Sequence, residues 1–79
     1  MTHTPHELAE EFPGFADQLH KLKMTDTHFA RLAEEYHEVN RAIHRAETNV
    51  EPMSEAHEGE LRRKRMELKD AIARMLRAA

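Results

Sequence analysis

The chain has 79 residues, carries a formal net charge of −3, and is 39% hydrophobic by composition. It has no cysteine, which excludes disulfides and cysteine-based zinc sites, and no apolar stretch approaches the ~20 residues of a membrane span. The polar start MTHTPHELAEE is unlike a signal peptide. Helix-favouring residues dominate. We therefore expect one all-α domain over residues 1–79, in the cytoplasm and with no membrane partner.

Two short helices are predicted at the beginning of the chain. Thr4 and Glu7 have the spacing of a capping box, which predicts a helix over residues 5–11. The Pro13-Gly14 pair interrupts it, because the residue before a proline is disfavoured in a helix. A second helix is predicted over residues 15–23. It is too short to be stable alone, so we expect it to dock on the rest of the chain.

Two long helices are predicted in the remainder of the chain. Asp26 is a good N-cap for a helix over residues 27–48, and Ser54 for a helix over residues 55–77. The connection at 49–53 is short, so the two helices should be antiparallel neighbours. Their heptad positions form two apolar stripes, made by Phe29, Leu32, Tyr36, Val39, Ile43 in the first and by Leu61, Leu68, Ile72, Met75 in the second.

These patterns predict an antiparallel, coiled-coil-like helical hairpin over residues 26–79, preceded by a short helical arm over residues 1–25. Charge supports the antiparallel pairing. Residues 1–60 carry 13 acids and 5 bases, whereas residues 61–79 carry 2 acids and 7 bases. Two oppositely charged halves can fix their own pairing.

The length of the loop also predicts a register. A turn near Val50 and Glu51 places Tyr36 opposite Arg65 or Met66. The acidic group Glu34, Glu35 and Glu38 would then face the basic segment Arg62–Arg65. Asn40 borders the first apolar stripe, where a polar group can select a register.

The whole chain resembles the YdcH-like family of small bacterial helical-hairpin proteins of unknown function. The resemblance lies in HELAEEFPGFADQLHKLK at 6–23, DTHFARLAEEYHEVNRAIHRAETNVEP at 26–52 and LRRKRMELKDAIARML at 61–76. Gly14 stands where that family often has an acidic residue. The resemblance implies a helical hairpin and no reaction, because the family has no established catalytic residues.

Candidate sites for chemistry are few. The chain has seven histidines, and Glu34 with His37 forms one Glu-x-x-His pair, which is half of a carboxylate-bridged dimetal motif. A complete site would require an oligomer, so the pair is interpreted as helix surface and no metal or cofactor is expected. Ser54, the only serine, is interpreted as a helix cap. We expect no enzymatic activity and no small-molecule substrate.

The basic segment Arg62, Arg63, Lys64 and Arg65 raises the alternative of a nucleic-acid-binding regulator. Four consecutive helical residues point in different directions around the helix, and no aromatic residue is interleaved for base stacking. A salt-bridged hairpin surface is the preferred interpretation.

The leading hypothesis is a protein–protein interaction or structural module that self-associates. Two helices cannot bury both stripes together with the further apolar residues of the chain. The expected partner is a second copy or another helical protein. The expected interaction seam is Phe29, Leu32, Tyr36, Val39, Ile43, Leu61, Leu68, Ile72 and Met75.

Overall fold

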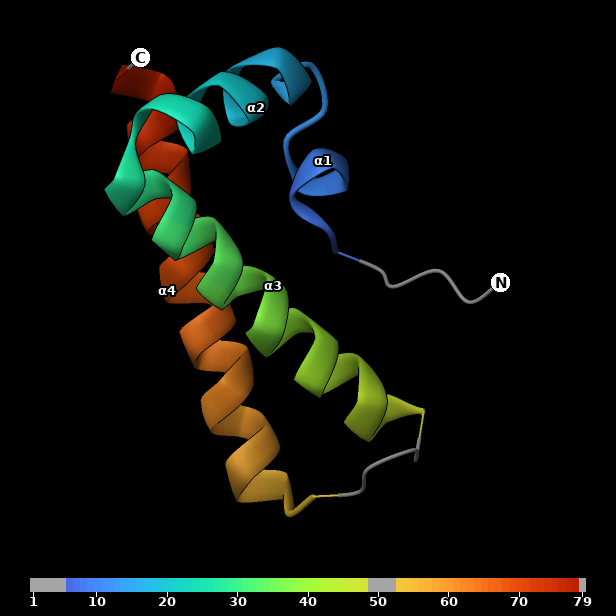
Figure 1. Cartoon of the computed structure of the whole chain (residues 1–79). Helices are drawn as coiled ribbons and strands as arrows, with labels where there is room; N and C mark the ends of the chain where they lie inside the picture. Colours follow the sequence, from blue (N-terminus) through green and yellow to red (C-terminus); the bar gives the residue numbers. More distant parts are fainter. Residues whose placement is uncertain (1–5, 49–52, 79) are drawn as a thin grey trace.

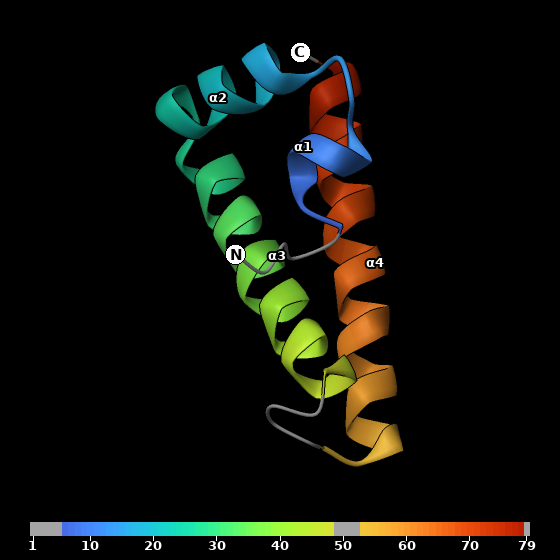
Figure 2. The ribbon, with the colours of Figure 1, turned by 90° about the vertical axis from the view of Figure 1, so that its right-hand side faces the viewer.

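The fold is a helical hairpin with a helical arm folded back on it. The computed structural model describes residues 6–48 and 53–78. Its helices are α1 (Leu8–Glu11), α2 (Ala16–Thr25), α3 (Thr27–Glu47) and α4 (Glu55–Ala78). The helices α3 and α4 run antiparallel, α2 crosses the end of the pair near the C-terminus, and α1 lies beside both (Figures 1 and 2). The predicted all-α hairpin preceded by two short helices is confirmed.

The ends of the long helices follow from their capping residues. The Asp26 carboxylate accepts a hydrogen bond from the Phe29 N–H at 3.1 Å, and the Ser54 hydroxyl oxygen accepts one from the His57 N–H at 3.1 Å. Both predicted N-caps are therefore confirmed. The predicted turn around Val50 and Glu51 lies outside the described residues.

The arm differs from its prediction at both helices. Helix α1 begins at Leu8, not at Pro5, because His6 has a positive φ of 62° and leaves the helical region. Thr4 of the predicted capping box lies outside the described residues. Gly14 has a φ of 89° in the turn before α2, a conformation that favours glycine. Helix α2 continues to Thr25, two residues beyond its predicted end.

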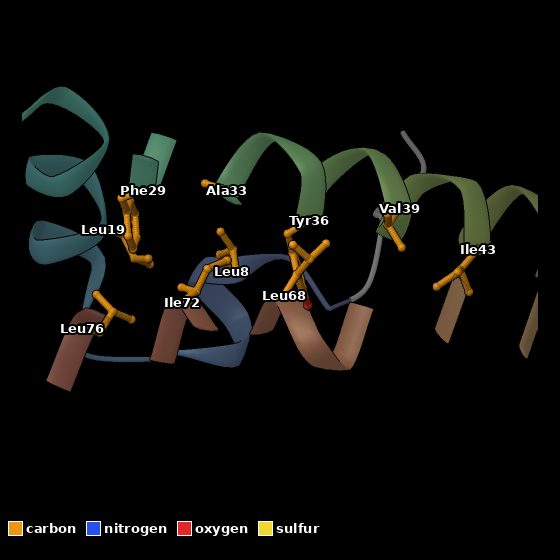
Figure 3. Close-up of a cluster of buried hydrophobic side chains, with 10 residues drawn as sticks. All are labelled: Leu8, Leu19, Phe29, Ala33, Tyr36, Val39, Ile43, Leu68, Ile72 and Leu76. Atoms are coloured by element: carbon orange, nitrogen blue, oxygen red, sulfur yellow. The ribbon is translucent and has the colours of Figure 1, made fainter. Parts of the chain in front are cut away.

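The core is continuous from α2 across the hairpin. Its buried apolar side chains come from all four helices and meet along one line (Figure 3). They are Leu8, Leu19, Phe29, Ala33, Tyr36, Val39, Ile43, Leu68, Ile72 and Leu76. The other members of the predicted seam, Leu32, Leu61 and Met75, are partly buried against this cluster. The stripes predicted from the heptads therefore pack against each other within one chain.

The register is shifted by about one helical turn from the expected one. Tyr36 packs against Leu68 rather than lying opposite Arg65 (Figure 3). The guanidinium of Arg65 instead donates a 3.0 Å hydrogen bond to Oδ1 of Asn40, a residue only 1% exposed. Arg62 contacts Glu47 and Glu58, each at 3.0 Å. The expected pairing of these two arginines with Glu34, Glu35 and Glu38 is therefore wrong.

Candidate functional site

A groove of about 540 Å³ lies between the arm and the hairpin, bounded by α1, α2 and α3. Small side chains line much of it, since four of its apolar residues are alanines. The apolar lining consists of Leu8, Ala9, Ala16, Leu19, Ala30 and Ala33. Of these, Leu8, Leu19 and Ala33 are buried and continue into the core. The groove is thus an open, apolar extension of the core surface.

The polar residues around this groove are divided by charge. Helix α2 contributes His20 and Lys23, and α3 contributes Glu34 and His37. Glu7, just before α1, completes the set, and its Oε2 lies 2.8 Å from Nδ1 of His37. The basic side chains of α2 therefore lie across the groove from carboxylates supplied by α3 and by the residue before α1.

The wall formed by α1 is held in place by polar contacts and by two apolar side chains, Leu8 and Phe12, that pack on the core. We call residues 6–12 the α1 segment. The Tyr36 hydroxyl donates a 2.6 Å hydrogen bond to the carbonyl oxygen of His6, the residue with positive φ. Lys69 donates to Oε1 of Glu11 at 3.1 Å and lies 6.0 Å from the centroid of the Phe12 ring. Leu8 supplies the buried apolar anchor of α1.

The contacts of the α1 segment change the acidity of two groups. Burial raises the pKa of Tyr36 to about 12, with a further contribution from the nearby Glu11 carboxylate. Burial also opposes ionisation of Glu11, but the hydrogen bond and charge of Lys69, with those of His6, outweigh it and lower the pKa of Glu11. The Glu11 carboxylate thus takes part in both shifts, because it adds to that of Tyr36 and is itself shifted by Lys69 of α4 and by His6.

The Glu34–His37 pair of the sequence analysis borders the groove. His37 is already engaged by Glu7, which sequence spacing could not reveal. Among residues 6–48 and 53–78, no three His, Cys, Asp or Glu side chains are grouped so that they could hold a metal ion. The arrangement therefore gives the metal hypothesis no support.

The basic segment on α4 is dispersed. Arg62 is bound by two carboxylates, and Arg65 is turned toward the core, where it contacts Asn40. Arg63 and Lys64 are exposed. The four side chains thus divide between intramolecular contacts and solvent, and the nucleic-acid alternative stays a prediction.

Sequence patterns did not identify Glu7 and Lys23 as groove residues or His6 as the partner of Tyr36. The hydrogen bond from Tyr36 uses a backbone carbonyl 30 positions away, and a main-chain acceptor leaves no signal in residue identity. The pairing of His37 with Glu7 requires the arm to fold back on the hairpin. Only the need of the short helices to dock indicated that contact.

Comparison with known proteins places the hairpin in a family. A family model described as "Protein of unknown function (DUF465)" matches residues 29–76, more than half of the chain. This is the YdcH-like family that the sequence resembles. No curated protein and no solved structure matches the chain. None of the described helices combines the length and the apolarity that crossing a membrane would require.

Proposed function

The chain belongs to the DUF465 family of proteins of unknown function, and we propose that it is a protein–protein interaction module that self-associates through the groove between α1, α2 and α3. The observation that carries this proposal is the open apolar surface of the groove, bordered by both positive and negative side chains. Concave apolar surfaces with a few convergent polar groups are the preferred positions of binding sites.

The groove is a better candidate for the binding surface than the predicted seam, because most of the seam residues are buried within the chain. Six of the nine predicted seam residues are buried inside the chain, among them Tyr36, Ile43 and Ile72 with no exposed surface. A partner could reach them only by opening the hairpin. By contrast, Ala9 and Ala16 are exposed within the groove. A partner can therefore contact this surface without any rearrangement of the core.

The form of the groove suits a polypeptide better than a small molecule. Small-molecule sites typically enclose about 70–90% of their ligand, whereas the alanines of α1 and α2 leave this groove open to solvent. Alanine surfaces permit close approach of another backbone, as at helix–helix contacts. Side chains from a helix of a second chain would fill the space and cover the apolar lining.

Sedimentation equilibrium of the full chain tests the proposal. We expect the average mass to rise above that of one chain at tens of micromolar. Ala16→Glu places a charge in the groove and should keep the protein monomeric. Ala56→Glu is the matched control, because Ala56 is an exposed alanine on α4, away from the groove. A wild-type chain that remains monomeric throughout this concentration range contradicts the proposal.

A further inference from the structure

We infer that the groove is filled by a second copy of the chain related by a two-fold axis, with Met24 of each copy inserted into the groove of the other. The inference rests on the proposed self-association and adds its geometry. In the arrangement, the α2 side of one groove faces the α3 side of the other. Each copy therefore gives and receives the same contacts.

Charge complementarity supports a second copy as the occupant. A two-fold interface uses one surface patch on both chains, so that patch must be complementary to itself. The groove meets this requirement, because Lys23 lies on its α2 side and Glu34 on its α3 side. Rotation about a two-fold axis brings Lys23 of each chain toward Glu34 of the other. A groove with charges of one sign on both sides would repel its own copy.

Met24 supplies an apolar side chain that can cover the alanine-rich lining of the partner's groove. It is 74% exposed, and Met66 on α4, at 59%, is the other exposed large hydrophobic side chain of the described residues. Met24 follows the groove residue His20 by four positions, so it lies one turn further along nearly the same side of α2. Its flexible thioether side chain fits irregular apolar spaces, such as one lined by alanines.

The required interface is compatible with the size of the chain. A specific interface buries about 800 Å² on each partner, which is about a seventh of the 5651 Å² surface of this chain. The groove would form the centre of this area, and the exposed flanks of α2 and α3 would form its rim. The charged pairs at the rim would fix the orientation of the two copies.

Charge reversal tests the arrangement directly, because the two chains can be changed separately. Lys23→Glu places two acids together at each contact, and Glu34→Lys places two bases together. Each variant alone should dimerise about tenfold more weakly at low salt, because an isologous interface contains every substitution twice. Mixing the two variants should restore dimerisation, since both contacts of the mixed dimer then join a lysine to a glutamate. Sedimentation equilibrium at about 0.05 M salt measures all three samples.

The role of Met24 in the interface is tested by comparing it with Met66, the other exposed methionine. Met24→Glu should weaken dimerisation, whereas Met66→Glu, a matched change on α4, should leave it unchanged. All four substituted side chains are exposed, so circular dichroism should show the wild-type helix content in every variant. A wild-type dimer with no rescue on mixing, or with equal effects of the two methionine changes, overturns the two-fold arrangement but leaves self-association standing. A monomeric wild type overturns both.

Discussion

The hairpin and the α1 segment are held by different kinds of contact. Between α3 and α4 the contact is an apolar seam in which Phe29, Ile43 and Ile72 have no exposed surface. The α1 segment buries one apolar side chain, Leu8, and packs a second, Phe12, partly against the core, and its remaining contacts are hydrogen bonds and ion pairs at its edge. Apolar burial supplies most of the favourable free energy of folding, whereas exposed ion pairs contribute little.

This difference indicates that one chain combines a stable scaffold with a weakly held wall of its groove. Regions with few buried apolar contacts open locally at a lower free energy than the whole fold. The α1 segment should therefore detach from the hairpin more often than α3 and α4 separate. The three predictions below test this contrast, in order of decreasing effect.

The largest contrast is expected between Ile72→Ala and Leu8→Ala. Ile72 is fully buried in the seam, so its truncation should lower the free energy of unfolding by about 2–5 kcal/mol. Truncation of Leu8 should lower the free energy of unfolding by less. Its effect is limited to the free energy that holds the α1 segment on the hairpin, because the segment detaches once that free energy is lost. Urea unfolding followed by circular dichroism measures both. Equal losses would show that the arm and the hairpin form one cooperative unit.

The second prediction concerns the titration of Tyr36, which is the only tyrosine in a chain without tryptophan. Tyrosinate absorbance therefore reports this side chain alone. The folded protein should titrate near the pKa of about 12, against 10.0 for an unperturbed tyrosine. Because the pKa is raised in the folded state, the contribution of Tyr36 to stability should be constant below pH 10 and be lost as the pH rises toward 12.

Leu8→Ala tests whether the α1 segment shields the Tyr36 hydroxyl. Loosening the α1 segment exposes the Tyr36 hydroxyl to water, so the variant should titrate at a lower pH than the wild-type protein. Leu61→Ala, at a partly buried position near the start of α4, is the control. An unchanged midpoint in Leu8→Ala would mean that the arm does not shield the tyrosine.

The smallest effect is expected at Glu11. Its pKa is lowered in the folded state, so its contribution should be present above the ordinary value of 4.5 and lost as the pH falls below it. Glu11→Gln should cost about 0–1 kcal/mol of unfolding free energy at neutral pH and reduce the acid dependence. Glu67→Gln, an exposed change on α4, serves as control. Acid unfolding curves that coincide for Glu11→Gln and the wild type would contradict the role of Lys69.

The hairpin was predictable from the sequence because each of its determinants is local or periodic. Asp26 and Ser54 identify the starts of the long helices, and the heptad spacing identifies the side chains that meet. The register was not predictable to within a turn, because the stripes repeat and loop length limits their alignment only loosely. The candidate groove could not be predicted either, since it depends on how the arm folds back. No periodicity links Glu7 to His37.

The hydrogen bond between Arg65 and Asn40 has a consequence for any redesign of this hairpin. Sliding one helix past the other would break this hydrogen bond to the buried amide of Asn40, at a cost that leucine in both places would avoid. Leucine at both positions would therefore raise the stability of the hairpin and weaken its preference for a single register. The hydrogen bond between Arg65 and Asn40 thus lowers the stability of the hairpin and makes its register more specific.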